Sequence, residues 1–380
     1  MNTDKKDKFR GCLIGGAVGD ALGYAVEFLP ESEIFGRYGN GGITEYELCG
    51  GKALISDDTQ MTMFTATALL DGVTRGRLRG IMGSFPDYIA LEYKGWYLTQ
   101  TFSYPVDIKD NYSRYSWVMN YPEMFARRSP GNTCLSALAS GKTGTLEKPL
   151  NNSKGCGGIM RAAPVGLYFS NGNYSRMPQE QIDIIGAQSA TITHGHDLGY
   201  IPTAAFVHII SRLAQEDISI EEAAKSAVIS AEKLFENSEH IGYFSDLMNK
   251  ALALANSDID DLDAIHALGA GWVAEETLAI ALYCAVKYST DFEQAVCTAV
   301  NHGGDSDSTG SVCGNIMGTS LGCKAIPQKY KENLELRDVL TELADDLLND
   351  CQMSEYADYS DEVWLKKYVN KTYGAITEEE

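Results

Sequence analysis

The stretch that decides the fold reads CLIGGAVGDALG and covers residues 12–23. It opens with an apolar run over residues 12–18 and continues past Asp20 with small residues at helical spacing. Lys5, Lys6, Lys8 and Arg10 precede the run, as basic residues precede the apolar part of a secretory signal peptide. Because Asp20 ends the run and the helical pattern continues, we interpret the stretch as the first helix of a folded domain.

The same small-residue helical pattern recurs along the rest of the chain. Alternating apolar and polar runs are scarce, and no strand–helix–strand order appears. The pattern predicts helices over residues 59–70, 182–190, 203–213, 220–235, 275–286, 292–300 and 334–348. We therefore predict an all-α fold, a compact bundle of many helices.

Glycines cluster between these predicted helices, at 15–16, 50–51, 155–158, 269–271 and 303–304. Helices that end in glycine turns around a common centre suit a central site built from loops. Residues 87–121 are rich in Tyr, Ser and Asp with weak periodicity, which indicates an irregular insertion near the mouth of such a site. Residues 326–380 form a helical C-terminal extension. Without a repeat or a linker, we predict one domain over residues 1–380.

Composition excludes several classes of function. The formal net charge of −21 would repel phosphate backbones, so we expect no binding to nucleic-acid backbones, although one anionic ligand could bind in a locally neutralised pocket. No stretch reaches the ~20 apolar residues that cross a bilayer, so we expect no membrane partner. The nine cysteines lack CxxC pairs and zinc-ligand spacing, which predicts reduced thiols in a cytoplasmic protein.

Two acidic clusters stand far apart, SDDT at residues 56–59 and DSDST at residues 305–309. Each places two carboxylates and neighbouring hydroxyls within four or five residues. Such hard oxygen ligands suit Mg²⁺ or Mn²⁺, and four carboxylates could hold two ions and leave positions for substrate and water. A helix N-cap explains one residue of the first cluster, but not Asp57 and Asp58 together. A solvated turn remains an alternative for the second.

Other motif interpretations fail or stay incomplete. An EF-hand loop starting at Asp305 has Ile316 where a bidentate Glu is required, and a phosphatase-type DxDxT should follow a strand, whereas residues 293–300 look helical. Residues 141–143 (GKT) lack the earlier glycine of a phosphate-binding loop. The HD pair at residues 196–197 could ligate a metal, yet no second histidine and aspartate at suitable spacing completes a set.

Six segments, in order, resemble motifs of the ADP-ribosylglycohydrolases, a family that includes the dinitrogenase-reductase-activating glycohydrolase. They are GAVGDALG with Glu27 and Phe28 following, SDDT at 56–59, GCGGIMRAAP at 155–164, THGH at 193–196, GAGWVAEET at 269–277 and NHGGDSDSTG at 301–310. The resemblance spans residues 9–325. It implies an all-α domain that hydrolyses the glycosidic bond between ADP-ribose and its acceptor.

The resemblance also implies a binuclear site for two divalent cations, Mg²⁺ or Mn²⁺. Its ligands would be Ser56, Asp57, Asp58, Asp305, Asp307 and Ser308. Cations there would bind the hydroxyls of the distal ribose and lower the pKa of a water molecule. A carboxylate such as Asp58 would stabilise the positive charge that develops at the anomeric carbon, or would accept a proton. Glu27 follows Asp20 by seven residues, so both would share one face of a continuous helix. It would act as ligand or proton acceptor; a surface carboxylate is the alternative.

Substrate contacts are expected from glycine-rich turns, because glycine lets the backbone approach phosphate. The residues expected to bind substrate are Gly131, Asn132, Ser153, Gly155, Gly157, His194 and Trp272. By resemblance, His194 would contact the distal ribose or a phosphate rather than a metal. Trp272, between glycines, could stack on an aromatic ring or pack in the core.

One departure concerns the acceptor. Members that act on arginine-linked ADP-ribose carry an acidic residue where this chain has Ser129, so Asp107, Asp110 or Glu123 would have to replace that charge. Cys156 also stands where some members carry Asn. We expect N-linked, arginine-type protein ADP-ribosylation as the substrate, with O-linked or small-molecule conjugates as the alternative. A non-catalytic ADP-ribose-binding regulatory protein is the other alternative, which the intact acidic set disfavours.

Overall fold

A computed structural model of the chain describes residues 4–106, 116–174 and 176–374. The helices of the first half are α1 (Lys5–Tyr24), α2 (Glu31–Tyr38), α3 (Asp57–Arg79), α4 (Phe85–Thr101), α5 (Asn132–Ala139), α6 (Ala163–Phe169) and α7 (Gln179–Thr191). Those of the second half are α8 (Asp197–Gln215), α9 (Ile220–Leu234), α10 (Ile241–Ala255), α11 (Asp261–Leu268), α12 (Ala274–Lys287), α13 (Phe292–Val300), α14 (Ser306–Leu321), α15 (Gln328–Glu332), α16 (Arg337–Asn349) and α17 (Glu362–Tyr368).

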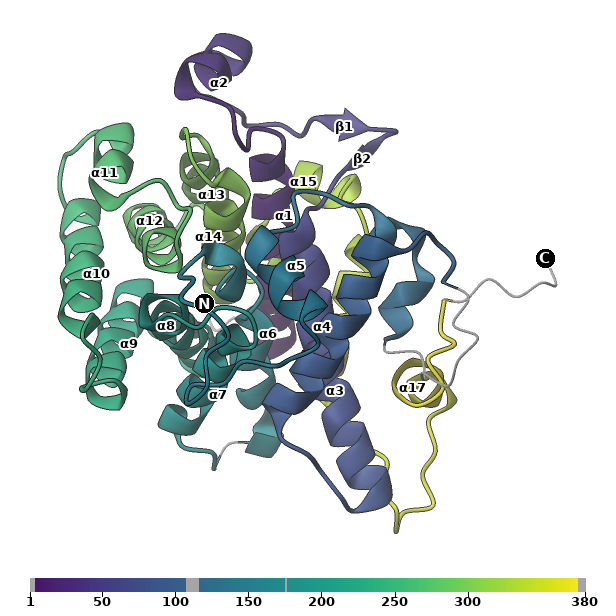
Figure 1. Cartoon of the computed structure of the whole chain (residues 1–380). Helices are drawn as coiled ribbons and strands as arrows, with labels where there is room; N and C mark the ends of the chain where they lie inside the picture. The colour runs from purple at the N-terminus through teal and green to yellow at the C-terminus, as the bar shows by residue number, and fades with distance from the viewer. Residues whose placement is uncertain (1–3, 107–115, 175, 375–380) are drawn as a thin grey trace.

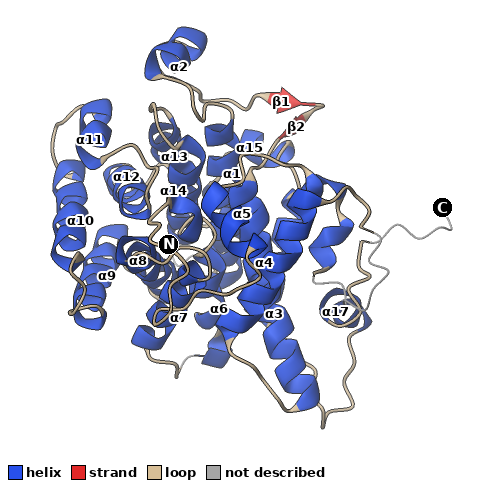
Figure 2. Ribbon diagram, viewed as in Figure 1, coloured by secondary structure: helices blue, strands red, loops and turns tan. Residues whose placement is uncertain are grey.

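Strands contribute little to these described ranges. The only sheet in them is a hairpin of β1 (Leu48–Cys49) and β2 (Lys52–Ala53), in which Leu48 lies opposite Ala53. Short 3₁₀-helices lie at η1 (Trp117–Asn120), η2 (Pro122–Phe125), η3 (Cys156–Gly158), η4 (Gly172–Tyr174) and η5 (Cys323–Ala325). The predicted all-α fold is confirmed (Figure 2).

The centre of the bundle is an antiparallel pair formed by α1 and α14 (Figure 1). Every fourth residue of α1 at positions 11, 15, 19 and 23 is glycine, and these glycines face the glycines of α14 at 318, 314 and 310 and the start of that helix. A Cβ on Gly19 would lie 1.9 Å from the carbonyl oxygen of Gly310, so only glycine permits this backbone contact. The pairing brings the end of α1 to the beginning of α14.

Two groups of helices flank this pair (Figure 1). On one side α8 to α13 pack on one another, and α12 and α13 contact α14. On the other side α3 packs against α4, and α16 and α17 contact α3. Both acidic clusters predicted from the sequence therefore lie at helix N-termini near the centre of the molecule, one on α3 and one on α14.

Part of the predicted irregular insertion, residues 87–121, is a regular helix. Residues 87–101 belong to α4, which begins after the cap Ser84 and has proline in its first turn. Its buried face carries Phe85, Ile89, Tyr93 and Trp96, which repeat at three- and four-residue spacing. The prediction was wrong because polar residues, Glu92, Thr99 and Gln100, are buried beside this stripe and an apolar one, Leu91, is exposed, so the apolar periodicity is weak.

The predicted helix over residues 334–348 also begins later than expected. Residues 333–335 run beside β2: the backbone N–H of Ala53 donates to Asn333 and that of Glu335 donates to Ala53, at 2.9 and 3.1 Å. Leu336 then adopts a left-handed conformation with φ of 52° before α16 starts. The strand-like pairing with β2 overrides the helical pattern at these residues. No helix in the described parts of the chain is long and apolar enough to cross a membrane.

Candidate active site

A cavity of about 340 Å³ opens where α1, α3, α5, α12 and α14 meet. We call it the acidic pocket. It is lined by Glu27, Phe28, Asp57, Asp58, residues 129–134, Gly155, Cys156, Gly157, Met160, His194, Trp272, Asp305, Asp307 and Ser308. The cavity thus gathers residues from most of the motifs singled out in the sequence. Ser56 and Ser153 lie close behind this lining and are not part of it.

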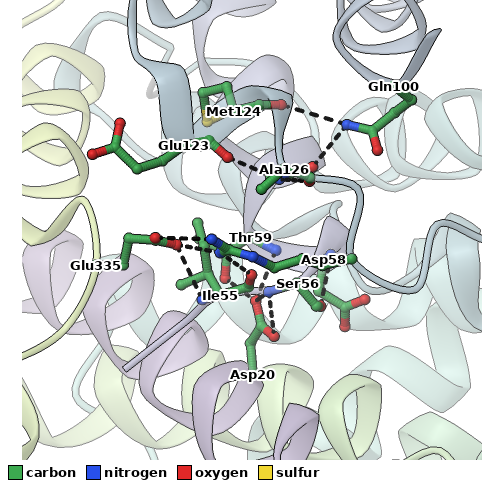
Figure 3. Close-up of polar contacts among 12 residues, drawn as sticks. Asp20, Ile55, Ser56, Asp58, Thr59, Gln100, Glu123, Met124, Ala126 and Glu335 are labelled. Atoms are coloured by element: carbon green, nitrogen blue, oxygen red, sulfur yellow. Dashed lines mark hydrogen bonds and ion pairs between the residues drawn. The ribbon is translucent and has the colours of Figure 1, made fainter. Parts of the chain in front are cut away.

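The first acidic cluster is positioned by Asp20 of α1. The Asp20 carboxylate accepts the backbone N–H groups of Ser56 and Thr59 at 3.0 and 3.1 Å, and the Thr59 hydroxyl as well (Figure 3). The Ser56 hydroxyl in turn accepts the N–H of Asp58 at 3.2 Å and caps α3. Ser56 and Asp20, both fully buried, therefore act as supports that aim Asp57 and Asp58 at the cavity.

The second acidic cluster begins α14. Asp305 stands at the N-cap, and Asp307 and Ser308 lie in the first turn. One carboxylate oxygen from each of Glu27, Asp305 and Asp307 lies within 4.8 Å of the others, which is close enough for a shared cation. The thiol of Cys156 donates to Oδ2 of Asp305 at 2.8 Å from the opposite wall.

Glu27 reaches this group by a different route from the one expected. Helix α1 ends at Tyr24, so Glu27 does not share a continuous helix with Asp20. The chain turns over residues 25–28, where the N–H of Glu27 donates to the carbonyl of Gly23 and Phe28 takes a positive φ of 65°. This tight turn carries the Glu27 carboxyl into the acidic pocket, beside Ser129 and Asp307.

The carboxyl groups of the acidic pocket are costly to ionise together unless a cation compensates their charge. Burial, the largest cause, raises the pKa of Glu27 to about 7, and it raises the pKa values of Asp57, Asp58 and Asp307 well above the ordinary range of Asp. Repulsion between the neighbouring carboxylates adds to the rise. Oε2 of Glu27 and Oδ2 of Asp58 have no hydrogen-bond partner within the described residues. These unpartnered oxygens fit hard divalent cations, which bind carboxylates.

Arg128, next to Ser129 in the chain, does not neutralise the carboxylates of the acidic pocket. It donates from Nη1 to the carbonyl of Ile55 at 2.7 Å and pairs through both terminal nitrogens with Glu335. Its charge is therefore already engaged by the Glu335 carboxylate, outside the acidic pocket.

The opposite wall of the pocket is a glycine turn backed by His194. A Cβ on Gly157 would lie 2.9 Å from Cε1 of His194, so the turn and the ring are in close contact. Nη2 of the buried Arg161 donates to the Thr193 hydroxyl at 2.7 Å, and that hydroxyl lies 2.8 Å from Nδ1 of His194. Burial lowers the pKa of His194 to about 3, so the ring is neutral. When Thr193 donates its proton to Nδ1, Nε2 carries the ring hydrogen and faces the turn as a donor.

Ser153 and Trp272 differ in how near they come to the cavity. The Ser153 hydroxyl lies 3.2 Å from that of Thr133 and accepts the Gly155 N–H at 3.4 Å, so it joins the two turns beneath the cavity wall. Trp272 is 41% exposed and stacks on Phe28, with ring centroids 5.4 Å apart and planes inclined by 23°. The exposed stack at the pocket rim excludes the core-packing interpretation of Trp272. Phe28, adjacent to Glu27, is its partner that sequence reasoning missed.

The residues predicted to influence acceptor recognition differ in their position relative to the acidic pocket. Ser129 lines the pocket in a left-handed conformation, with φ of 51°, beside Glu27. Glu123 lies outside the lining, and Figure 3 shows its carboxylate turned away from Asp58. Asp107 and Asp110 fall outside the described residues.

Comparison with known proteins places these features in a family. The profile of the ADP-ribosylglycohydrolase family matches residues 1–357. An uncharacterized protein of Archaeoglobus fulgidus is 28% identical over 349 residues, 89% of this chain and 95% of the relative. The ADP-ribosyl-[dinitrogen reductase] glycohydrolase of Rhodospirillum rubrum is 25% identical, over 87% of this chain and 91% of the relative.

Two further similarities are more distant. The human ADP-ribosylhydrolase ARH3 is 24% identical over 207 residues, which is 48% of this chain and 54% of the relative. A solved structure described as an ADP-ribosylglycohydrolase-related protein complex superposes with a TM-score of 0.57 at 23% identity, covering 91% of this chain and 98% of that one. At that identity the superposition shows a shared fold.

Proposed function

The chain belongs to the ADP-ribosylglycohydrolase family, and on that premise we propose that it is a binuclear-metal hydrolase of the bond between ADP-ribose and an acceptor. Family membership makes it an ADP-ribosyl glycohydrolase. The proposal adds two Mg²⁺ or Mn²⁺ ions. The observation that supports them is the convergence of Glu27, Asp305 and Asp307 beside Asp57 and Asp58, with buried oxygens that have no hydrogen-bond partner in the part of the chain that the structure describes.

The proposed ligands are Asp57, Asp58, Asp305, Asp307 and Ser308, with Ser56 supporting them from behind. When bound, the two cations supply positive charge that orients the ribose hydroxyls and lowers the pKa of a water. Glu27 would serve as the proton acceptor through Oε2, which has no hydrogen-bond partner among the described residues. Asp58 stabilises the positive charge that develops at the anomeric carbon.

The remaining pocket residues hold the substrate. The N–H of Gly157 and the side-chain amide of Asn132 face the pyrophosphate, and Nε2 of His194 donates to a phosphate or the distal ribose. Gly131 and Gly155, whose N–H groups donate to Asp57 and Ser153, let the backbone of the two turns lie close to it. The stack of Trp272 on Phe28 closes one edge of the cavity and presents an aromatic face to the ligand.

The experiment is a release assay. An ADP-ribosylated protein is incubated with the enzyme after chelation and then with Mg²⁺ or Mn²⁺ restored, and free ADP-ribose is measured. We expect release only with metal. Binding of ADP-ribose by calorimetry without any release from N-linked, O-linked or small-molecule conjugates would establish the non-catalytic alternative instead.

For the acceptor we propose N-linked, arginine-type ADP-ribose. The position of Ser129 favours a second candidate, an O-linked acceptor. A guanidinium leaving group departs protonated, and a carboxylate beside Glu27 would hold it, whereas Ser129 offers only a hydroxyl. O-linked groups need no such partner.

Ser129→Asp tests this choice against arginine- and serine-linked substrates. If arginine is the natural acceptor but poorly held, the variant should improve kcat/KM for arginine-linked substrate by about ten- to a hundredfold, the value of a charge-assisted contact of roughly 1.5–3 kcal/mol. Ser136→Asp, which adds the same charge on the exposed face of α5, is the control. A wild type that is fast on serine-linked and inactive on arginine-linked substrate would reject the N-linked proposal.

A further inference from the structure

A second group of potential ligands lies outside the acidic pocket, at the start of α8 and of α10. His196 is the N-cap of α8, Asp197 is its first residue, and His240 precedes α10. One ligand atom from each of the three lies within 4.8 Å of the others. The HD pair that stayed incomplete in the sequence therefore acquires its second histidine from a residue more than forty positions later.

The contacts in this cluster place electron pairs opposite one another. Nδ1 of His196 lies 2.8 Å from Oδ1 of Asp197, and Nδ1 of His240 lies 2.9 Å from Oδ2. The backbone N–H of Leu198 donates to Nδ1 of His196 at 3.0 Å and to Oδ1 of Asp197 at 2.8 Å. Nδ1 of His196 and Oδ1 of Asp197 therefore both accept the same Leu198 hydrogen and face each other as two acceptors. A cation between them would stabilise this arrangement.

Helix capping accounts for only part of this arrangement. Capping of α8 explains why His196 accepts the Leu198 N–H, but it requires nothing of His240. The His196 and His240 rings lie with centroids 4.9 Å apart, and the Ser238 hydroxyl donates to Asp197 beside them. Half-buried side chains from two separate helices thus converge on one carboxylate, which is partly open to solvent.

We propose that His196, Asp197 and His240 bind a divalent transition-metal ion of the zinc type, separate from the cations of the acidic pocket. Two imidazole nitrogens with one carboxylate are the ligands that zinc-type ions favour, whereas Mg²⁺ prefers an all-oxygen shell. The fourth position is left to water or to the Ser238 hydroxyl. The proposal does not depend on the hydrolytic function.

Such an ion would stabilise the substrate wall of the acidic pocket. The backbone N–H of His196 donates to the carbonyl of Ser153 at 3.2 Å, and Ser153 begins the turn that contains Gly155. An ion that joins the starts of α8 and α10 would therefore hold the anchor of that turn. We assign it a structural role.

Zinc binding is tested on the full chain in saturating Mg²⁺, with a chromophoric zinc indicator as competitor. Wild type is compared with His240→Gln, which keeps a polar side chain of similar size at a partly exposed position. His266→Gln is the control, because His266 is exposed and also contacts a carboxylate, that of Glu31, at 2.6 Å. We expect wild type and control to bind one more zinc ion than His240→Gln, or to bind it about 100-fold more tightly, since removing even supporting contacts of a metal costs 10–100-fold.

A second measurement needs no variant. Crystals of wild-type protein soaked in zinc should give an anomalous peak within bonding distance of a nitrogen of His196 and of His240, about 2.0–2.1 Å. Equal zinc binding by wild type and His240→Gln would overturn the proposal, as would zinc found only in the acidic pocket or at cysteines.

Discussion

At the scale of single residues, Glu27 stands out because its carboxyl is held in the acidic pocket by a turn rather than by a helix. Burial raises its pKa to about 7, and Oε2 lacks a partner within the described residues. A group with such a pKa can exchange protons near neutral pH. A residue that served only as a surface carboxylate would show neither property.

Glu27→Gln should therefore separate proton transfer from binding. The amide keeps the size and one oxygen of the side chain but cannot accept a proton, so the rate should fall by about 10²–10⁴-fold. ADP-ribose and metal affinity, measured by calorimetry, should stay close to wild type. A variant that loses its metal would instead make Glu27 a ligand and contradict the assigned role.

Asp58 and Asp307 carry a second prediction. Removing either carboxylate, as in Asp58→Ala or Asp307→Ala, should abolish turnover because both proposed ions lose a ligand. Removal also relieves repulsion among buried carboxylates, so the metal-free variants should fold, and excess Mg²⁺ or Mn²⁺ should raise their Tm less than it raises that of wild type.

The control for this pair is Asp338→Ala, which removes an aspartate that is 83% exposed and pairs with its neighbour Arg337. It should retain activity and the full metal-dependent rise in Tm. Near-wild-type turnover by Asp58→Ala or Asp307→Ala would reject the binuclear proposal at that residue.

Residue types and their spacing in the sequence were enough to predict many residues of the acidic pocket. They were not enough to predict contacts between segments that lie far apart in the chain. Asp57, Asp58, Asp305 and Asp307 stood out because adjacent carboxylates are costly unless something binds them. The stacking of Phe28 on Trp272 depends on a turn with positive φ that no short motif announced. The assigned roles of these residues stay predictions.

At the scale of elements, the pairing of α1 with α14 positions the site. The glycines of α1 repeat every four residues, so they form one stripe along the helix, and the same spacing occurs in α14. Backbone-to-backbone contact then fixes the distance between the first turn of α14, with Asp305 and Asp307, and the turn that carries Glu27. An added methyl group in this stripe would separate the two.

Gly19→Ala should accordingly destabilise the protein strongly. Its Cβ would lie 1.9 Å from the Gly310 carbonyl oxygen, and overpacking of this kind costs about 3 kcal/mol or more when backbone must move. Gly36→Ala in α2 is the matched control, since its Cβ would meet nothing within 4 Å. That control should be neutral or stabilising by up to about 1 kcal/mol, from reduced unfolded-state entropy.

Urea unfolding of the three proteins measures both effects. A Gly19→Ala protein as stable as wild type would show that α1 and α14 do not need glycine at their contact.

Element types were predictable where one apolar face dominates, and boundaries were less so. The helices over residues 203–213 and 275–286 were predicted from periodicity and lie within α8 and α12. Helix α4 was not predicted although Ile89, Tyr93 and Trp96 mark its buried face, because buried polar residues beside them weaken the apolar periodicity. The late start of α16 follows from pairing with β2, a tertiary effect that local periodicity does not contain.

At the scale of the whole molecule, the acidic pocket couples stability to pH. The folded-state pKa values of Asp20 and Glu27 rise to about 6 and 7, above the unfolded values of about 3.9 and 4.3. A raised carboxyl pKa stabilises the fold below the unfolded value, and this contribution is lost as pH rises through the folded value. The loss falls between pH 4 and 7 for the pKa values given.

The Tm of the metal-free protein should therefore fall between pH 4 and 7, and Mg²⁺ should reduce the fall because bound cations favour the ionised carboxylates. Lowered pKa values of His194 and His302 act in the opposite direction, so wild type is compared with Glu27→Gln. The variant should show a smaller fall. Equal slopes for wild type and variant, measured by calorimetry without metal, would contradict the prediction.

The antiparallel contact of α1 with α14 also sets an order of events during synthesis. Helix α1 ends at Tyr24 and α14 begins at Ser306. The glycines of α1 can therefore contact those of α14 only after about 280 further residues have been synthesised. At roughly 5–20 residues per second, that interval is on the order of 15–60 s on the ribosome. The two halves of the carboxylate cluster come together only after it, which makes the acidic pocket a late product of folding.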